Sequence, residues 1–485
     1  MLSVRSRRTD EQESERSYEP RSGVAPVEQR GAGKRKLMKP NREKAKQPAI
    51  VKESKPSQQV GEEQTVKDCA KFYVWTNQML DRLAKSEPTT KWFRLWDKVC
   101  SKVNLHQSFM MVRKNKGAPG CDDQTIQRFE AQLNRELDKL VGELKDGTYR
   151  PLPAKRVWID KPGSPEKRPL GIPAVRDRVV QTALRNVLEP IWEKDFAEQS
   201  YGFRPGRGSQ QAIDRIEQLL NEGYTHIVDA DLKSYFDTIN HEKLMQEIRK
   251  RIVDGSVLKL LESYLKAGVL DEMKGRESTD QGTPQGSVIS PLLANLYLNP
   301  LDHKMAERGW EMVRYADDFV ILCRTGQEAK AALAYIEKWV QEVDLTLHPT
   351  KTHIAEAEHE RFDFLGWTFS IKNKVFRKWP RKKSVAKLRE NLRPKTKRNN
   401  GQGIAMVIAT INPILRGWRG YFKEAKPHDL EREDGWIRRR LRAMLRKQQK
   451  RPGFGKNERD HKQWPNRWFA ERGLYSLKAG SCNYV

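Results

Sequence analysis

The sequence predicts an α+β body followed by a mostly helical, strongly basic C-terminal region. Residues 225–231 are mostly apolar and β-branched and end in Asp231, which is typical of a buried strand. In residues 312–323 two apolar stretches are interrupted by Asp317 and Asp318, which predicts a strand–turn–strand hairpin with both carboxylates at its tip. Apolar residues at helical spacing predict helices at residues 126–144, 178–196, 405–415 and 435–448.

The N-terminal third changes character several times along the chain. Residues 1–65 are rich in Glu, Gln, Ser, Lys, Arg and Pro with few aromatics, which predicts a disordered basic arm. From residue 66 apolar residues recur at helical spacing, up to a turn-like break at residues 115–120. Residues 157–159 and 169–172 are then expected to form two strands joined by a turn rich in Pro and Gly.

Basic residues outnumber acidic ones, and the excess is concentrated in two segments. The 485 residues include 92 Lys and Arg against 64 Asp and Glu, a net charge of +28. Residues 371–485 carry 32 basic and 9 acidic residues, a net +23, and residues 30–55 carry 10 and 2, a net +8. The rest of the chain is therefore nearly neutral, at −3. An excess of this size repels itself unless an anion neutralises it.

Aromatic residues are interleaved with the C-terminal charge. They include five tryptophans: Trp379, Trp418, Trp436, Trp464 and Trp468. Basic groups bind phosphates and flat rings stack on unpaired bases, so this region is predicted to bind nucleic acid. The competing interpretation is a solvated, charged surface.

Several classes of protein are excluded by composition. The chain has no apolar run of 18 or more residues, so no membrane-spanning helix is expected. Its five cysteines are not paired at short spacing, which argues against a zinc ribbon or a disulfide framework and favours a reducing, intracellular compartment. The N-terminus has neither a secretory signal nor a typical transit peptide.

The acids at the hairpin tip suggest a metal site. Neighbouring carboxylates repel one another, and a divalent cation removes the repulsion. Mg²⁺ prefers carboxylate oxygens, water and phosphates as ligands. An Asp-Asp pair in a turn is by itself common, but Asp231 ends a strand where its carboxylate could meet the hairpin. Two metal ions about 3.5–4 Å apart would activate an attacking hydroxyl and stabilise a leaving pyrophosphate, which is the chemistry of nucleotidyl transfer.

A series of short motifs makes the resemblance specific. Residues 315–318 (YADD) resemble the catalytic motif of reverse transcriptases, and the surrounding segments resemble the group II intron-encoded reverse transcriptase/maturase family. These segments are residues 115–120 (NKGAPG), 147–151 (GTYRP), 167–173 (KRPLGIP), 200–207 (SYGFRPGR), 231–241, 281–287 (QGTPQGS), 347–352 (LHPTKT) and 364–367 (FLGW). Residues 411–422 (INPILRGWRGYF) resemble the family's maturase, or thumb, signature.

The resemblance implies an α+β right-hand polymerase (fingers and palm) with a mostly α-helical thumb/maturase domain. The expected divisions are a disordered basic arm (1–65), an N-terminal extension (66–130), reverse transcriptase fingers and palm (131–372), a thumb/maturase domain (373–450) and a basic C-terminal tail (451–485). Many members of the family end in a DNA endonuclease rich in His and paired Cys. The tail contains one histidine, His461, and one cysteine, Cys482, so we expect it to bind DNA or RNA without an endonuclease.

Catalytic and nucleotide-binding roles follow from the same resemblance. It implies that Asp231, Asp317 and Asp318 are catalytic and bind two Mg²⁺ ions. Asp229, on the same strand face, is interpreted as a solvated or hydrogen-bonded acid. The residues implied to contact the incoming dNTP are Lys161, Arg168, Phe236, Gln285 and Lys351.

These five residues have distinct implied roles. Lys161 and Arg168 correspond to the clamp on the triphosphate, although either could be an ordinary surface charge. Phe236 corresponds to the aromatic residue that blocks a ribose 2′-hydroxyl, and Gln285 lines the nucleotide. Lys351 matches a lysine that protonates the leaving pyrophosphate, and its ammonium would neutralise developing charge even without proton transfer.

Seven residues are predicted to contact nucleic acid: Arg204, Arg416, Trp418, Arg438, Arg439, Arg440 and Arg442. Arg204 could contact template phosphate or be a buried structural arginine. Arg438 and Arg442 are four residues apart and share a helix face, while Arg440 points elsewhere.

The resulting functional hypothesis is an RNA-directed DNA polymerase that binds its structured group II intron RNA, assists splicing and copies the intron into DNA. Its expected partners are intron RNA, target DNA with its primer, and dNTPs, in the bacterial cytoplasm and on the nucleoid. One alternative is an intron-independent reverse transcriptase of the same lineage, in host defence or DNA repair. The other is a non-catalytic splicing cofactor, against which the complete set of three acids argues.

Overall fold

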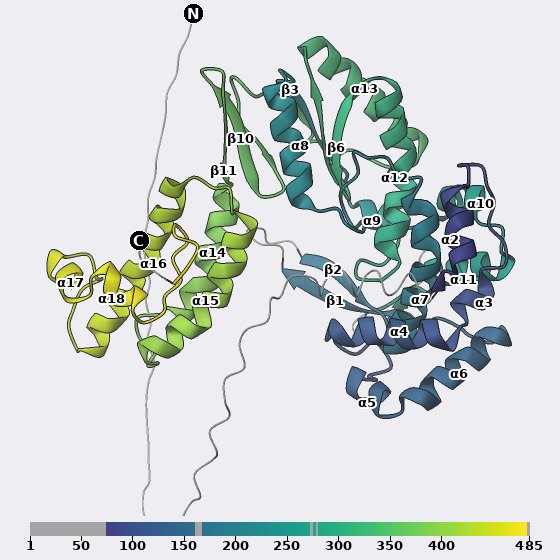
Figure 1. Ribbon diagram of the computed structural model, residues 1–485, viewed down its shortest axis with the longest axis horizontal. Coiled ribbons are helices and arrows are strands. Elements are labelled where there is room, and N and C mark those ends of the chain that lie inside the picture. Colours follow the sequence, from purple (N-terminus) through teal and green to yellow (C-terminus); the bar gives the residue numbers. More distant parts are fainter. Residues whose placement is uncertain (1–73, 161–166, 272–274, 278–279, 483–485) are drawn as a thin grey trace, which may run out of the picture. The chain divides into compact units, whose positions relative to one another are not determined.

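The computed structural model describes residues 74–160, 167–271, 275–277 and 280–482 (Figure 1). All of them lie in one compact unit, Gly61–Val485. The predicted basic arm and Lys161 lie outside the described residues, so nothing in the structure bears on them.

A four-stranded antiparallel sheet lies at the centre of the palm. Its strand order is β6-β7-β3-β8, with β6 Glu311–Tyr315, β7 Asp318–Cys323, β3 His226–Asp231 and β8 His353–Glu356. The predicted strand at residues 225–231 and the predicted hairpin at residues 312–323 are therefore confirmed as β3 and as β6–β7.

Alternation along these strands gives each face of the sheet its own hydrophobic core. Val228 and Ala230 of β3 face the first core, while Ile227 faces the second. Helix α13 (Gly326–Glu342) packs against β3, β7 and β8 (Figure 1). Because side chains alternate at a period of two, Asp229 and Asp231 lie on the same face as Ile227. The sequence pattern of β3 thus brings two acids to one side of the strand.

The fingers contain a second sheet, of order β2-β1-β4-β5. It consists of β1 Ala154–Asp160, β2 Lys167–Ile172, β4 Val269–Asp271 and β5 Gly275–Glu277. Strands β1 and β2 pair antiparallel from Lys155–Ile172 to Asp160–Lys167, which confirms the two predicted strands. The tip of β1 is exposed at Trp158 and Ile159.

Helices form the N-terminal extension and the rest of the fingers and palm. The long α7 (Val175–Glu193) is almost completely buried in the first core and packs against α4. The predicted helix at residues 126–144 is interrupted at Gln132, which separates α5 from α6. The other helices of this part are α2 Asn77–Ala84, α3 Trp96–Val99, α4 Lys102–Lys114, α5 Ile126–Ala131, α6 Leu133–Lys145, α8 Ser209–Asn221, α9 Tyr235–Thr238, α10 His241–Arg251, α11 Gly255–Leu265 and α12 Ser290–Glu307.

A third sheet separates the palm from the thumb helices along the chain. It is antiparallel, with order β11-β10-β9: β9 Phe362–Phe364, β10 Trp367–Lys372 and β11 Val375–Pro380. The expected thumb boundary, between residues 372 and 373, falls in the turn of the β10–β11 hairpin. The helices of the thumb begin only at Lys382, with α14 Lys382–Lys395, α15 Ile404–Tyr421 and α16 Pro427–Gln448.

The C-terminal segment is part of the folded thumb. We expected residues 451–485 to form a basic tail, but Trp464, Phe469 and Leu477 are buried in the second core. The Asp434 carboxylate of α16 accepts hydrogen bonds from the backbone N–H of Leu477 and from the Ser476 hydroxyl. Trp464 and Leu474, which flank α18 Asn466–Ala470, and Phe469 within it share this core with residues of α15 and α16, whereas α17 Glu458–Gln463 has no apolar residue. Among the described residues, no helix is long and apolar enough to cross a membrane.

Candidate active site

The predicted catalytic acids meet at one end of the palm sheet. Asp231, the last residue of β3, pairs directly with Asp318, the first residue of β7, in the antiparallel register. Directly paired residues in such a ladder have side chains on the same face, about 4.5–5.5 Å apart at Cβ. Asp317 lies in the turn between β6 and β7, next to this pair. The structure therefore brings Asp231 beside two acids that follow it by more than 80 residues in the sequence.

The turn that carries Asp317 has an unusual backbone. Ala316 has a φ of 60°, in the left-handed region that residues with a side chain seldom adopt. The preceding Arg314 is completely buried, and its guanidinium donates a 2.9 Å hydrogen bond to the Ala316 carbonyl. Asp317 and Asp318 therefore extend from a turn whose backbone accepts a hydrogen bond from a buried side chain.

The acids raise one another's pKa. Burial, and next the nearby charges of Asp229, Asp317 and Asp231, raise the pKa of Asp318 from 3.8 to about 7. Burial raises the pKa of Asp317 too, with a further upward contribution from Asp231, while the Arg168 guanidinium acts in the opposite direction. A bound cation would relieve the repulsion between these carboxylates.

The three acids offer the kind of ligand atoms that a hard divalent cation prefers. Carboxylate oxygens are the ligands that Mg²⁺ prefers, and three carboxyl groups converge on the end of the sheet. In the part of the chain that the structure describes, however, no group of three or more His, Cys, Asp or Glu is already arranged to hold a metal ion. The case for a metal here therefore rests on the chemistry of the acids and their mutual repulsion.

The ammonium of Lys351 forms an ion pair with one of the three carboxylates. Nζ of Lys351 lies 2.6 Å from Oδ2 of Asp231. The loop that carries Lys351 is fixed to the end of β3, because the His348 amide donates to the Asp231 carbonyl at 2.7 Å. Lys351, which the sequence places 120 residues from Asp231, thus lies beside the acids, as its predicted role requires.

The predicted nucleotide-binding residues lie on segments that contact one another. Phe236 is half-buried on α9, and its carbonyl accepts a 2.6 Å hydrogen bond from the backbone amide of Thr283, in the loop that contains Gln285. The Gln285 carbonyl in turn accepts a hydrogen bond from the Gly171 amide of β2. Three motifs far apart in the sequence are therefore joined through their backbones.

Close backbone approach explains the glycines of this loop. A Cβ on Gly286 would lie 2.4 Å from the Gly171 carbonyl oxygen, and its φ of 109° is open only to glycine in practice. On the same strand as Gly171, Arg168 is exposed and near enough to Asp317 to affect its pKa. The fingers hairpin, the palm acids and the Gln285 loop thus share one neighbourhood.

Two of the seven residues predicted to contact nucleic acid are buried within the protein: for Arg204 this is the structural alternative, and for Arg442 it differs from the expectation. Arg204 forms an ion pair with Glu193, Nη2 to Oε1 at 2.9 Å, and donates to the Ser200 carbonyl. Arg442 is 2% exposed, and its guanidinium donates to the Trp464 carbonyl. Each binds carbonyl groups of a neighbouring loop, so neither side chain is free to contact phosphate.

The other arginines of α16 are also mostly used within the protein. The Arg438 side chain is 11% exposed and lies 4.0 Å from Asp434. Arg440 stacks over Trp436 and donates to the Thr396 hydroxyl. Arg439 is half-buried. The face that Arg438 shares with Arg442 packs against the C-terminal segment.

The tryptophans of the basic region likewise pack against the protein's own residues. Trp464 is 4% exposed, and Trp436 lies beneath Arg389 and Arg440. The guanidinium carbon of Arg472 lies 3.6 Å from the ring centroid of Trp468. The expectation that interleaved aromatics stack on bases is therefore not supported for these three tryptophans.

Arg416 and Trp418 lie on α15 within the maturase-like segment. Arg416 is exposed and stacks over Tyr475. Trp418 lines a groove of about 410 Å³ between the β9–β10 turn and the helices α14 and α15. Its indole Nε1 is buried and has no hydrogen-bond partner among the described residues. The complete groove lining is Leu365, Gly366, Ser384, Lys387, Leu388, Asn391, Ile414, Trp418, Tyr421 and Phe422.

Two residues beside the acids were not recognised as important from the sequence. Asp229 is half-buried; burial raises its pKa to about 6, with Asp231 contributing in the same direction and His353 opposing it. Its position two residues before Asp231 on the same strand face was the available signal. No local pattern singles out Arg314, which lies on a strand, since its buried partners come from the helix α12.

Family models match both halves of the chain. Residues 159–369 match the reverse transcriptase (RNA-dependent DNA polymerase) model, which includes the three acids. Residues 385–467 match the maturase-specific domain of group II introns, which includes α15, α16 and the first part of the C-terminal segment.

Curated relatives are similar to large parts of this chain. Protein YkfC of Escherichia coli (strain K12) is 36% identical over 324 residues, which cover 58% of this chain and 84% of YkfC. The group II intron-encoded protein LtrA of Lactococcus lactis subsp. cremoris is 40% identical over 197 residues, 40% of this chain and 32% of LtrA. Among solved structures, a partial Cas6-RT-Cas1–Cas2 complex is 26% identical with a TM-score of 0.33, covering 51% of this chain and 41% of that one, a similarity too weak to indicate a shared fold by itself.

The domain matches, the relatives and the palm geometry lead to one conclusion. The chain belongs to the group II intron-encoded reverse transcriptase/maturases, a family of RNA-directed DNA polymerases that carry an intron maturase domain.

Proposed function

We propose that this chain synthesises DNA on an RNA template at the palm acids and binds a group II intron RNA through its thumb. It would assist splicing of that RNA and then copy it into DNA during intron mobility. The observation that carries the proposal is the direct cross-strand pair of Asp231 and Asp318, with Asp317 in the adjoining turn, in a chain that also has a maturase domain.

Asp231, Asp317 and Asp318 are assigned as the residues that hold two Mg²⁺ ions. When bound, these ions would lower the pKa of the attacking primer hydroxyl and stabilise the charge of the leaving pyrophosphate. The raised pKa values of Asp317 and Asp318 support the assignment, because a cation would favour their charged forms.

The residues around the acids are assigned to the nucleotide. Lys351 donates a proton to the leaving pyrophosphate or neutralises its charge, and Arg168 contacts the triphosphate. Phe236, half-buried on α9, excludes a ribose 2′-hydroxyl by its bulk, while Gln285 contacts the nucleotide from the opposite segment. Their common neighbourhood supports these roles. For Lys161, which lies outside the described residues, the same clamp role rests on the sequence alone.

The exposed charges of the thumb are assigned to RNA. Lys382, Lys383 and Lys387 of α14 are exposed, and Lys387 lines the groove with Trp418. Trp418 lines the same groove and is assigned to contact nucleic acid there. Arg416 and the half-buried Arg439 remain assigned to RNA phosphates. Such interactions would make the affinity strongly dependent on salt.

The remaining partners follow from the same proposal. Target DNA would supply the primer, dNTPs the substrate, and the ribonucleoprotein would act in the cytoplasm and on the nucleoid. A reverse transcriptase that has left its intron would share the palm but would not copurify with one RNA. A non-catalytic cofactor would bind the RNA without extending a primer.

One preparation tests these possibilities together. The protein is purified from its host under low salt, its bound RNA is sequenced, and the same sample is given an RNA template, a DNA primer and dNTPs with Mg²⁺. We expect enrichment of a single group II intron RNA and extension of the primer. Extension without an enriched intron supports the intron-independent enzyme, and enrichment without extension supports the non-catalytic cofactor.

A further inference from the structure

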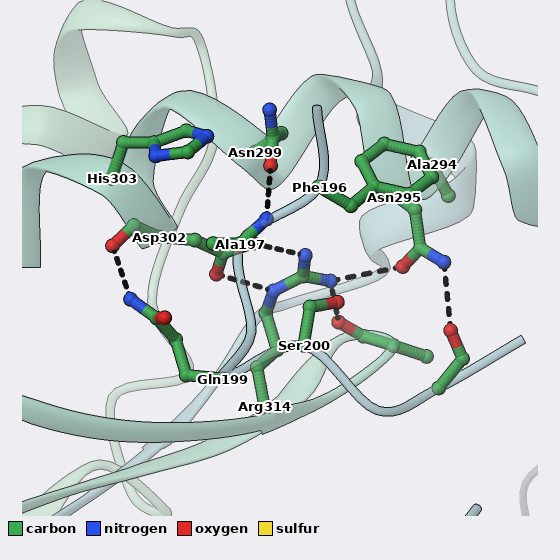
Figure 2. Close-up of polar contacts among 12 residues, drawn as sticks. Phe196, Ala197, Gln199, Ser200, Ala294, Asn295, Asn299, Asp302, His303 and Arg314 are labelled. Atoms are coloured by element: carbon green, nitrogen blue, oxygen red, sulfur yellow. Dashed lines mark hydrogen bonds and ion pairs between the residues drawn. The ribbon is translucent and has the colours of Figure 1, made fainter. Parts of the chain in front are cut away.

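Arg314 is a charged side chain in the interior of the palm, and the nucleotidyl-transfer chemistry does not use it. It lies on β6, three residues before Asp317, and is 0% exposed. Its Nε donates to Oδ1 of Asp302 on α12 at 2.7 Å, and its Nη2 pairs with the other oxygen of the same carboxylate. Asp302 is also completely buried. Figure 2 shows the guanidinium among side chains of α12.

The third nitrogen of the guanidinium is used differently. Nη1 of Arg314 donates to Oδ1 of Asn295 at 3.0 Å and to the carbonyl oxygen of Ala316 at 2.9 Å. Ala316 is the residue with a φ of 60° in the turn that carries the catalytic acids. The arginine thus connects helix α12 to the residue of that turn with a left-handed backbone.

A second segment fixes the same turn from another side. The side-chain amide of Asn295 donates to the Gly202 carbonyl at 2.7 Å. A Cβ on Gly202 would lie 2.3 Å from the Ala316 amide nitrogen, so the two backbones are in direct contact. Asn295 therefore forms hydrogen bonds to both Arg314 and Gly202, each of which contacts Ala316.

Stability alone does not account for this network. A buried ion pair loses the hydration of both charges, and apolar residues of similar volume often stabilise a core equally well. What an apolar pair lacks is a rigid fork of donors that can bind a carboxylate, an amide and a carbonyl at the same time. The feature that such a substitution would remove is the hydrogen bond to Ala316.

We infer that Arg314, oriented by Asp302 and Asn295, is a positioning residue that fixes the Ala316 turn so that Asp317 and Asp318 can share a metal ion. The inference rests on the proposed function, because it assumes that these acids bind metal. It specifies which hydrogen bonds hold them in place. A displacement of about 1 Å at a catalytic group can lower a rate by about 10²-fold.

Two variants separate positioning from folding. Arg314→Met combined with Asp302→Leu removes both charges and fills the space, so we expect it to fold with a Tm within a few degrees of the wild type. Arg314→Lys keeps a counterion for Asp302 but lacks the fork that reaches Ala316. If the double variant does not fold, Arg314→Lys decides the question.

The expected results concern metal binding and turnover. Titration with Mn²⁺ followed by electron paramagnetic resonance should show weaker binding at the palm in both variants, with Asp318→Ala defining the background. In primer extension, kcat should fall by about 10²-fold, while KM for dNTP changes by less than about threefold. Wild-type Mn²⁺ affinity together with wild-type kcat in folded variants would overturn the inference.

A matched control uses a second buried ion pair. Arg446 and Asp460 of the thumb form a similar pair, with side chains 11% and 0% exposed. Arg446→Met with Asp460→Leu should leave palm Mn²⁺ binding and kcat unchanged; an equal loss in this control would mean that the effect is a general one of buried pairs. If the wild type extends no primer, the proposed function fails, and the Mn²⁺ titration still decides whether Arg314 positions the acids.

Discussion

The ammonium of Lys351 lies 2.6 Å from the Asp231 carboxylate at the end of β3. The two residues belong to segments joined by a backbone hydrogen bond from His348 to Asp231, so their proximity is built into the palm. A cation held beside the acids is well placed to neutralise the charge that develops on a leaving pyrophosphate.

Lys351→Gln is expected to lower kcat for dNTP incorporation by roughly 10²-fold, because the variant has neither the proton donor nor its charge. Rapid-quench kinetics at saturating dNTP would measure the change. Lys351→Arg, which retains the charge, should be affected less than Lys351→Gln. Equal rates for both variants and the wild type would exclude a role in catalysis.

Phe236→Ala should admit ribonucleotides, because it removes the ring that we propose to exclude the 2′-hydroxyl. We expect the ratio of kcat/KM for dNTP over rNTP to fall by about 10-fold or more, equivalent to about 1.4 kcal/mol of discrimination. Tyr235→Phe is the control: the buried Tyr235 hydroxyl donates to the Ala294 carbonyl, so its removal affects packing and leaves the discrimination unchanged. An unchanged ratio in Phe236→Ala would remove the steric role.

The raised pKa of Asp318 predicts how stability depends on pH without metal. In the unfolded chain this carboxyl loses its proton near pH 3.8, whereas in the folded protein it keeps the proton up to about pH 7. Between these values the folded state binds more protons, so the free energy of unfolding falls as the pH rises. At about 1.4 kcal/mol per pKa unit, the decrease due to this group is at most roughly 4 kcal/mol.

Urea denaturation in EDTA at pH 5 and pH 8 would measure the larger part of this decrease, which falls above pH 5. Asp318→Asn should reduce the difference between the two pH values, and Mg²⁺ should stabilise the wild type more at pH 8 than at pH 5. The same pH dependence in Asp318→Asn as in the wild type would contradict the electrostatic account.

Reversing charge on α14 should weaken RNA binding in a way that salt reveals. Lys383→Glu with Lys387→Glu is expected to reduce the slope of log affinity against log salt by about 0.7–0.9 for each phosphate that the protein no longer neutralises. Filter binding of intron RNA between about 50 and 200 mM salt would test this. Lys330→Glu, which changes an exposed lysine of the palm helix α13, is the matched control. An intact slope in the α14 variant would move the RNA site elsewhere.

The strands that carry the acids could be predicted because their signal is local. Apolar, β-branched runs end at Asp231 and are interrupted at Asp317 and Asp318, and the structure places these runs in β3, β6 and β7. The β10–β11 hairpin was missed, since the basic residues Arg377 and Lys378 within it resembled the charged helices that follow.

The surroundings of the arginines could not be predicted from local sequence. The sequence left Arg204 open between template phosphate and a buried structural role and favoured nucleic acid for Arg442, but each donates to a carbonyl group that folding brings to it. The same limit concealed Arg314, whose partners Asn295 and Asp302 lie on α12. Whether an arginine binds phosphate or protein depends on tertiary structure, which composition does not encode.

The central claim is that Asp317 and Asp318 serve DNA synthesis and not RNA binding. Its most direct test is primer extension on an RNA template in Mg²⁺ by Asp318→Ala, alongside intron RNA binding by the same preparation and with the exposed Asp214→Ala on α8 as control. The account predicts that Asp318→Ala loses extension while its RNA affinity stays within a few-fold of the wild type, and that Asp214→Ala retains both. Near-normal extension by Asp318→Ala would contradict it.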